Sequence, residues 1–164
     1  MKRQQAGFTL IELVVVILIL SVLAATALPK FMDVTSKAHK AAVAGAGGGL
    51  GSAVALVHAQ WVANGSTAAV AAVPGFGAGD VAVSSNGWPI NTSGGVALTA
   101  HDDCVELWGG VMQNPPSVAT AATATTEDYV AAWTGTTCTF TYQPDTGRLI
   151  AYDASTGGVA ITNP

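Results

Sequence analysis

The stretch from Phe8 to Leu28 reads FTLIELVVVILILSVLAATAL. Its residues are apolar almost throughout, and Glu12 is the one charged residue among them. At about 1.5 Å per residue, a helix of this length spans about 30 Å, which is the thickness of the hydrocarbon core of a bilayer. The stretch therefore predicts a membrane-spanning helix with a single acid close to its start.

The heptapeptide before this stretch, Met1–Gly7, is polar and basic because it contains Lys2 and Arg3. Positive charges beside a membrane-spanning segment tend to stay on the cytoplasmic side. We therefore expect the N-terminus to face the cytoplasm and the residues after Leu28 to be exported.

An ordinary signal peptide and a plain membrane anchor are the two alternatives. A signal peptide would be cleaved at small residues such as 24–27, but this apolar run is longer than a usual signal core and continues into a long helical pattern. A plain anchor explains the length of the run but not Glu12, because acids inside a span are costly and usually functional.

The sequence is short, weakly charged and slightly acidic. It has 164 residues, of which 50% are hydrophobic and 10% are charged, and its formal net charge is −4. This length fits one domain plus an anchoring segment. The acidic balance gives no support to nucleic-acid binding.

Two cysteines, Cys104 and Cys138, lie far from the apolar stretch. An even number of cysteines in an exported chain predicts a disulfide. Two buried free thiols are the alternative.

The start of the apolar stretch resembles a known processing signature. Residues 7–13 read GFTLIEL, which is similar to the prepilin signature of type IV pilins and pseudopilins. The basic heptapeptide before it, the apolar span after it and the sequence Leu28-Pro29-Lys30-Phe31 match the same family. By this resemblance the chain is identified as a type IVa pilin precursor.

The resemblance implies how the chain is processed and assembled. A prepilin peptidase that is also an N-methyltransferase would cut between Gly7 and Phe8 and methylate Phe8. Thr9 and Glu12 would serve subunit assembly. The implied partners are identical pilin subunits, this peptidase, the inner-membrane assembly machinery and the membrane itself before assembly. The precursor would lie in the inner membrane, and the assembled filament would be extracellular.

The fold that the resemblance implies is α+β and shaped like a ladle. A long N-terminal helix packs on an antiparallel β-sheet, and a disulfide bounds one region of the head. We expect residues 1–7 to be a leader that is removed and residues 8–29 to form the transmembrane and filament-core half of the first helix. Residues 30–164 would form the globular head, including the amphipathic half of that helix.

Residues 30–63 are predicted to continue the first helix, with Pro29 kinking it near Ala25 because proline lacks a backbone donor. The glycine-rich run Gly45–Gly51 is its weakest part, and is either packed closely on the sheet or locally broken. Small and apolar residues recur at steps of three and four, which predicts the face that lies against the sheet. They are Phe31, Val34, Ala38, Ala41, Gly45, Gly48, Ser52, Leu56 and Ala59.

Turn and helix signals follow this helix. Asn64-Gly65 is expected to end it, and residues 64–95 to form a long connection in which Asn86–Pro89 is a turn that presents a tryptophan. A short helix is predicted over residues 99–113, with Thr99 as its cap and Asp102 three residues later. Its buried face is expected to hold Cys104, Leu107, Trp108, Val111 and Met112.

Strands are predicted near residues 129–134, 137–143 and 148–153. Cys138, Phe140 and Tyr142 alternate along the second of these, which places them on one face of a sheet. The residues Asp145-Thr146-Gly147 are expected to form the hairpin turn between the last two strands.

Short motifs in the head are similar to those of the mannose-sensitive haemagglutinin (MSHA) pilins. They are His58-Ala59 before Trp61, the turn Gly87-Trp88-Pro89, and Cys104 ahead of Leu107-Trp108. The resemblance implies the major structural subunit of an MSHA-like pilus, which is not an enzyme and which polymerises through its N-terminal helix for adhesion. The alternative is a major-type pseudopilin of a type II secretion system, which also polymerises but drives export.

The head offers no convincing catalytic or metal-binding constellation. His101-Asp102-Asp103 is better explained as the start of a helix, where acids are electrostatically favourable. Asp145 and Asp153 are few for a calcium site, which prefers several hard oxygen ligands. We therefore expect no metal, no cofactor and no catalytic residue.

Overall fold

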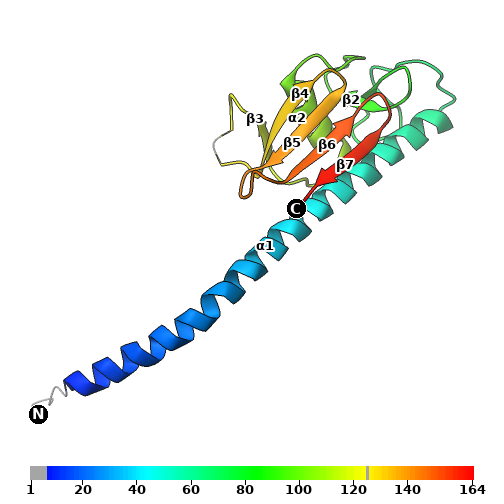
Figure 1. Cartoon of the computed structure of the whole chain (residues 1–164). Helices are drawn as coiled ribbons and strands as arrows, with labels where there is room; N and C mark the ends of the chain where they lie inside the picture. Colours follow the sequence, from blue (N-terminus) through cyan, green and yellow to red (C-terminus); the bar gives the residue numbers. More distant parts are fainter. Residues whose placement is uncertain (1–6, 125) are drawn as a thin grey trace, which may run out of the picture. The chain divides into compact units, whose positions relative to one another are not determined.

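The computed structural model describes residues 7–124 and 126–164. The chain falls into two compact units, residues 1–38 and 39–164. One helix, α1 (Leu10–Ala63), begins in the first unit and ends in the second (Figure 1). The long N-terminal helix, the sheet and the disulfide confirm the predicted α+β fold class.

The end of α1 lies where the sequence predicts it. The helix ends at Ala63, and Gly65 follows with a φ of 69°, a left-handed conformation that glycine adopts without a steric penalty. The Gly65 N–H donates to the Val62 carbonyl at 2.9 Å, and the Ser66 N–H donates to the Trp61 carbonyl at 3.3 Å. These bonds satisfy carbonyl groups that a helix end leaves open.

The packed face of α1 differs from the predicted one. The predicted stripe of small residues, from Phe31 to Ala59, is exposed to solvent. Large side chains outweigh small ones here, because the free energy of burial scales with the apolar area removed from water. The residues of α1 that are buried are Val43, Gly47, Leu50, Ala53, Val54, Val57 and Trp61.

The glycine-rich run of α1 is helical and unbroken. A Cβ atom added at Gly47 would lie 2.5 Å from Ile161 Cδ1, and one added at Gly51 would lie 3.8 Å from Val159 Cβ. These two glycines therefore let the helix approach the last strand closely, which confirms the close-packing alternative for this face. A Cβ at Gly45 or Gly48 would meet no atom within 4 Å.

A five-stranded sheet has the spatial order β3-β4-β5-β6-β7. Its strands are β3 (Val118–Thr120), β4 (Tyr129–Thr134), β5 (Thr137–Tyr142), β6 (Leu149–Asp153) and β7 (Gly158–Thr162). The predicted strands correspond to β4, β5 and β6, whereas β3 and β7 were not predicted.

The sheet is antiparallel, as expected, except at one edge, where β3 pairs with β4 in parallel. Hydrogen bonds at the start of the pair hold this arrangement. Asp128 Oδ2 accepts the Ser117 N–H at 3.1 Å, and Ser117 Oγ accepts the Asp128 N–H at 2.9 Å. These bonds bring the starts of the two strands together and so favour the parallel direction.

The core lies on the face of the sheet that carries the alternating residues of β5. Cys138, Phe140 and Tyr142 are buried as predicted. Phe140 lies between Ala131 of β4 and Ile150 of β6 in the strand register. Each strand therefore contributes every second residue to one hydrophobic layer.

Helix α2 (His101–Val111) covers part of this layer. Trp108 is fully buried, and its ring centroid lies 4.5 Å from that of Phe140 and 5.1 Å from that of Tyr129. Its Nε1–H donates to the Pro116 carbonyl at 2.9 Å, so its polar group is satisfied. Cys104, Leu107 and Val111 are buried with it as predicted, and Met112 lies just after the helix and is half-buried.

The start of α2 differs from the predicted cap. Ala100 is the N-cap residue, and the side chain that satisfies the helix start is that of Asp103. Its Oδ2 accepts the N–H groups of Thr99 at 2.7 Å and Ala100 at 3.0 Å, and the Thr99 hydroxyl at 3.1 Å. Asp103 performs this role because it lies three residues after the N-cap, where Asp102 does not.

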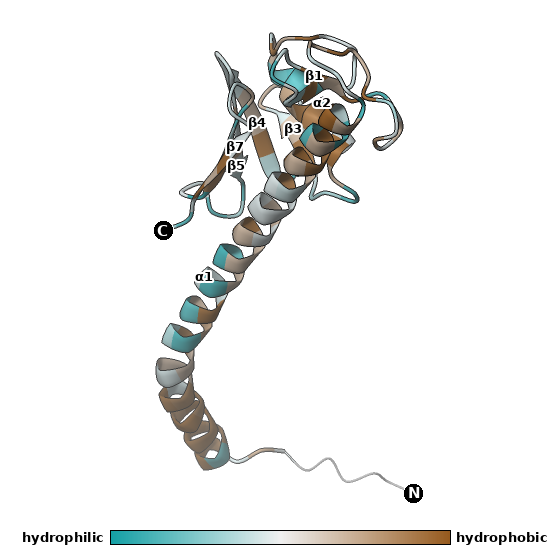
Figure 2. Cartoon of the chain, turned by 90° about the vertical axis from the view of Figure 1, so that its right-hand side faces the viewer, coloured by the Kyte–Doolittle hydropathy of each residue, from teal (hydrophilic) through white to brown (hydrophobic). Residues whose placement is uncertain are grey.

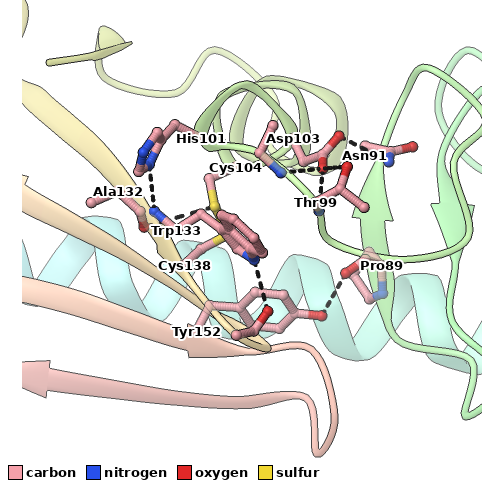
Figure 3. Close-up of a disulfide and its surroundings, with 12 residues drawn as sticks. Pro89, Asn91, Thr99, His101, Asp103, Cys104, Ala132, Trp133, Cys138 and Tyr152 are labelled. Atoms are coloured by element: carbon pink, nitrogen blue, oxygen red, sulfur yellow. Dashed lines mark hydrogen bonds between the residues drawn. A yellow bond between two sulfur atoms is a disulfide. The ribbon is translucent and has the colours of Figure 1, made fainter. Parts of the chain in front are cut away.

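The disulfide between Cys104 and Cys138 is present, and neither cysteine is free. It links α2 to β5 with a Cα–Cα distance of 5.6 Å (Figure 3). Near it, the Tyr152 hydroxyl donates to the Pro89 carbonyl at 2.7 Å. This bond joins β6 to the small sheet of β1 (Ala82–Val83) and β2 (Pro89–Asn91).

Candidate functional site

A capping box starts α1 at the residues that the resemblance assigns to assembly. Glu12 Oε2 accepts the Thr9 N–H at 2.8 Å and the Thr9 hydroxyl at 2.7 Å. In return, Thr9 Oγ1 accepts the Glu12 N–H at 3.3 Å. These reciprocal bonds satisfy donors that a helix start leaves open, and they explain why α1 begins at Leu10.

Gly7 and Phe8 lie before this cap, outside the helix. Phe8 is 91% exposed, and a Cβ atom added at Gly7 would meet no atom within 4 Å. No other described part of the chain covers these two residues. The first six residues of the expected leader lie outside the described residues.

The resemblance points to Thr9, but the reasoning from the sequence missed its structural role. The signal was present, because Thr9 to Glu12 reads TLIE, which fits the capping-box pattern of Ser or Thr followed three residues later by an acid. The structure thus gives Glu12 a bond within its own helix, in addition to any role between subunits.

Beyond Glu12, the first half of α1 is apolar on every side and uncovered. Figure 2 shows the ribbon of this part almost entirely in the hydrophobic colour, and its most apolar 18-residue stretch contains no buried residue. Large side chains around its circumference, such as Leu13, Ile17 and Leu20, are more than half exposed. By length and composition this helix can cross a membrane.

Three residues weaken α1 near the end of this apolar part. Ser21 Oγ donates to the Leu18 carbonyl at 2.7 Å, and Thr26 Oγ1 donates to the Leu23 carbonyl at 3.0 Å. Such bonds compete with the backbone ladder and tend to bend helices. Pro29 lies inside the helix and has no backbone donor. The kink at Pro29 stays a prediction.

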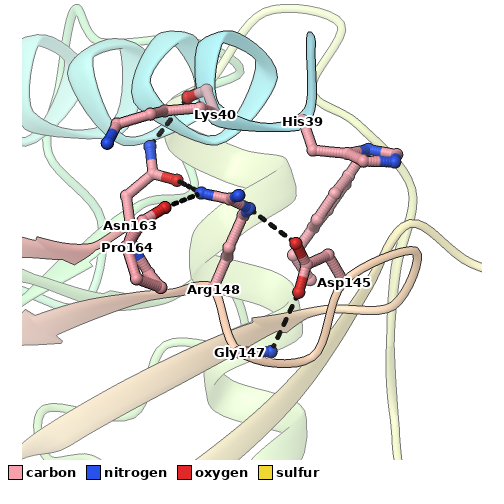
Figure 4. Close-up of polar contacts among 8 residues, drawn as sticks. His39, Lys40, Asp145, Gly147, Arg148, Asn163 and Pro164 are labelled. Atoms are coloured by element: carbon pink, nitrogen blue, oxygen red, sulfur yellow. Dashed lines mark hydrogen bonds and ion pairs between the residues drawn. The ribbon is translucent and has the colours of Figure 1, made fainter. Parts of the chain in front are cut away.

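The acids considered for calcium are engaged in local contacts. Asp145 Oδ2 accepts the Nε–H of buried Arg148 at 2.8 Å, and Arg148 also donates to Asn163 and to the Pro164 carbonyl (Figure 4). Asn163 donates in turn to the Lys40 carbonyl of α1 at 2.7 Å. These bonds join the turn between β5 and β6, the residues after β7, and the helix.

Asp153 is the last residue of β6 and precedes a separate turn. Hydrogen bonds from the backbone N–H and the hydroxyl of Ser155 hold the pKa of Asp153 below its usual range. Both acids thus form hydrogen bonds with the turns next to them. In the part of the chain that the structure describes, no three His, Cys, Asp or Glu side chains gather in a way that would hold a metal ion.

The three histidines each contact an aromatic ring. His58 stacks on Trp88 with ring centroids 3.9 Å apart and lies 5.6 Å from Trp61. His39 Nδ1 lies 3.0 Å from the Tyr142 hydroxyl. His101 Nδ1 accepts the backbone N–H of Trp133 at 2.8 Å (Figure 3), and the two ring centroids lie 6.4 Å apart. These contacts give each histidine a packing role.

The turn around Gly87 forms as predicted, with a Ser84 N–H to Trp88 carbonyl bond of 2.9 Å. Trp88, which this turn presents, is half-buried against His58. Gly87 is required there, because a Cβ atom would lie 2.4 Å from a ring carbon of Trp61.

Comparison with known proteins finds similarity over part of the chain. Residues 2–28 match the family model described as the prokaryotic N-terminal methylation motif. The chain is 43% identical over 77 residues to a type IV major pilin protein of Neisseria gonorrhoeae, covering 45% of this chain and 47% of that protein. No solved structure matches the chain.

Two further relatives come from other species. The chain is 43% identical over 74 residues to a fimbrial protein of Neisseria meningitidis, covering 43% of this chain and 44% of that protein. It is 44% identical over 54 residues to a type IV narrow pilus major component of Thermus thermophilus, covering 33% and 47% respectively. The chain thus spans about half the length of the curated relatives that it matches. Through this methylation motif and these matches, part of the chain is similar to type IV pilins.

Proposed function

We propose that the chain is the structural subunit of a type IV pilus of the MSHA type. In this proposal it is made as an inner-membrane precursor, cleaved between Gly7 and Phe8, methylated on Phe8, and polymerised into an extracellular filament. The names of its relatives, a major pilin, a fimbrial protein and a pilus component, support this assignment.

One observation carries the proposal: the first half of α1 is apolar around its whole circumference and no part of its most apolar window is buried. Exposed apolar area of this size is unfavourable in water. It needs a bilayer first and other subunits afterwards. A filament in which these helices pack together supplies that cover.

The presence of Glu12 favours a polymerising subunit over a protein that is only anchored in the membrane. An unpaired carboxylate within an apolar environment is costly. One of its oxygens, Oε2, already binds Thr9. The proposal pairs the Glu12 carboxylate also with the amine that cleavage creates on Phe8 of a neighbouring subunit. This pairing would set the axial register between subunits.

The MSHA assignment draws support from a cluster in the head. The motifs around His58, Trp61 and Gly87-Trp88-Pro89 are far apart in the sequence, yet their rings stack on one another. These motifs therefore describe one structural unit. Adhesion to surfaces is the role that we propose for the assembled filament.

The test is to examine the fibres of cells that express the chain. Mass spectrometry of sheared surface material should find a subunit that begins at methylated Phe8, and electron microscopy should show thin filaments. Gly7→Leu should leave uncleaved precursor in the inner membrane and no filament. A mature protein that retains Met1, or that begins after Ala27, would contradict the proposal.

A pseudopilin is separated from a pilin by the phenotype of a deletion. Loss of surface filaments and of attachment, with unchanged export of folded proteins, is expected for a pilin. Normal attachment with blocked export would instead assign the chain to a secretion system.

A further inference from the structure

One cavity of the head lies beside the start of α2. Its volume is about 560 Å³, and residues 99–102, 120–122 and 131–133 line it. These residues belong to the first turn of α2 and its cap, to the end of β3 with the loop after it, and to β4. Small-molecule sites in proteins usually have volumes of about 300–1,000 Å³, so this cavity is large enough for a ligand.

Two aromatic rings meet at this cavity. The rings of His101 and Trp133 stand at 77° to each other, with their centroids 6.4 Å apart. The backbone N–H of Trp133 donates to His101 Nδ1 at 2.8 Å, which fixes the imidazole beside β4 (Figure 3). The indole is held as well, because its Nε1–H donates to the Gly135 carbonyl at 2.7 Å. The fold therefore holds both rings in place, and a tryptophan face is the best aromatic surface for a cation.

Asp102 brings a carboxylate to the same cavity. It is exposed, and within residues 7–124 and 126–164 it forms no hydrogen bond and no ion pair. Its neighbour Asp103 is buried instead and accepts the N–H groups that start α2. Asp102 is therefore the acid of this turn that is available to a ligand.

The rest of the lining is apolar or already engaged. The hydroxyl of Thr99 donates to Asp103, and the hydroxyl of Thr120 shares a hydrogen bond with that of Thr123. A sugar would need several free donors and acceptors, which this wall does not offer. A cation that carries methyl groups suits it better, because the remaining lining residues are alanines: Ala100, Ala121, Ala122, Ala131 and Ala132.

The charge around the cavity also favours a cation. Residues 39–164 form one compact unit. Of the ten acids in the chain, only Glu12 and Asp33 precede this unit. Of the six basic residues, only Lys40 and Arg148 lie within it, and Arg148 is buried and ion-paired. An acidic surface attracts cations and raises their local concentration.

We propose that this cavity binds a quaternary ammonium group, such as the trimethylammonium group of choline. The ring of Trp133 contacts the methyl groups, and the carboxylate of Asp102 balances the charge. Free choline compounds and the headgroup of phosphatidylcholine share this group, so the ligand is either a solute or a lipid of a surface to which the filament attaches. The inference goes beyond the proposed function, since binding by the head does not require polymerisation.

The first test titrates the full chain, in a maltoside detergent, with choline and with 3,3-dimethyl-1-butanol, in which carbon replaces the quaternary nitrogen. Calorimetry should show saturable binding of choline and binding of the neutral analogue that is about tenfold weaker, because the ring and the carboxylate attract only the charged ligand. Equal affinities, or no saturable binding of choline, would overturn the inference. Binding of methyl glucoside as tight as that of choline would also overturn it, because the cavity would then be a sugar site.

The second test is a matched pair of variants, Asp102→Asn and Asp80→Asn. Both remove an exposed acid from the head, but only Asp102 lines the cavity. Asp102→Asn should weaken choline binding about fivefold, as expected for an exposed ion pair. Asp80→Asn should weaken it less than about twofold, since salt screens distant charges. Equal losses in the two variants would show that choline responds only to the net charge, and the proposed site would be wrong.

Trp133 is tested by two substitutions because it also packs on the core. Trp133→Leu should abolish measurable choline binding, and thermal melting shows whether this variant folds. Trp133→Phe keeps an aromatic ring and should weaken binding by a smaller factor, because phenylalanine attracts cations less strongly than tryptophan. Unchanged affinity in a folded Trp133→Phe and a folded Trp133→Leu would exclude this ring from the site.

Vesicles separate the two sources of the ligand. Sheared filaments should bind vesicles of phosphatidylcholine more than vesicles of phosphatidylethanolamine, whose headgroup lacks the methyl groups, and free choline should compete. Equal binding to both vesicles, together with saturable choline binding, would support the site and assign it to a soluble ligand. If the chain forms no filament, the pilus proposal fails, whereas the choline titration still decides whether the cavity is a binding site.

Discussion

The two halves of α1 differ in composition and in what covers them. The most apolar stretch of the helix lies in the first half, and none of it is buried. The second half buries a narrow face that includes Val43, Leu50 and Val57 against the rest of the head. One half depends on partners outside the chain, and the other depends on the chain's own sheet.

The two halves therefore illustrate two kinds of sequence pattern, an all-round apolar helix and a helix with one buried face. A helix that is apolar all round needs an apolar environment but does not specify one neighbour. A helix with a buried face needs one particular surface, and Gly47 shows how closely the two are fitted, because even one added carbon would lie 2.5 Å from Ile161. Changes in the first half should therefore alter assembly, whereas changes in the second half should alter folding.

The largest effect is expected from a change at Glu12, which should stop assembly without preventing folding or cleavage. Glu12→Ala should abolish filaments, because it removes the acid that sets the register of the apolar helices. The cleavage site is unchanged, so processed subunit should accumulate, as measured by mass spectrometry and by the yield of sheared filament. Thr9→Val is a matched control for the cap, since it removes the hydroxyl of the box but keeps the acid. Normal filaments from Glu12→Ala alone would exclude an assembly role for this residue.

Loss of the disulfide should lower the stability of the head and leave processing unchanged. The bond joins two cysteines of the head that are 34 residues apart in the sequence. In the chain-entropy model, a bond that closes a loop of this size stabilises the fold by about 4 kcal/mol. Cys104→Ala with Cys138→Ala should therefore lower the free energy of unfolding, measured by denaturant titration, without changing cleavage at Gly7. Finding two alkylatable thiols in purified native subunits would show that the bond does not form.

The glycine faces offer a smaller and more local comparison. Gly47→Leu should destabilise the head by about 1–3 kcal/mol, because the new side chain overpacks the contact with β7. Gly48→Leu should instead be neutral or stabilising by up to about 1 kcal/mol, since leucine has the better helix propensity and the site is open. Equal destabilisation by both changes would mean that the helix does not pack on Ile161 through Gly47.

The smallest effect at neutral pH concerns the tyrosines of the core. Burial, followed by the nearby Tyr142 and Asp128, raises the pKa of Tyr129 to about 12. Since the folded state disfavours the ionised form, this contribution to stability is complete below the ordinary pKa of about 10. It is lost as the pH rises towards about 12. Tyr129→Phe should leave the melting temperature at pH 7 nearly unchanged and reduce its fall above pH 10, whereas an identical alkaline profile would contradict the assignment.

Sequence reasoning succeeded where the signal is local. The apolar span, the single acid at Glu12 and the helix stop at Asn64-Gly65 depend on residues that are close neighbours in the chain. The strands β4, β5 and β6 also follow from local alternation, as Cys138, Phe140 and Tyr142 show. Two cysteines in an exported chain leave one possible intramolecular pair, so the disulfide was predictable as well.

The packed face of α1 and the edges of the sheet were decided by tertiary structure alone. In the second half of α1, small residues occur on several sides, so the helical period by itself does not select the buried side. The large side chains of Val43, Leu50 and Val57 select it once the sheet is present, because burying them removes the most apolar area from water. The parallel pairing of β3 likewise depends on the bonds between Ser117 and Asp128, which are 11 residues apart and meet only when the chain folds back. Such choices follow from contacts that exist only after the chain has folded.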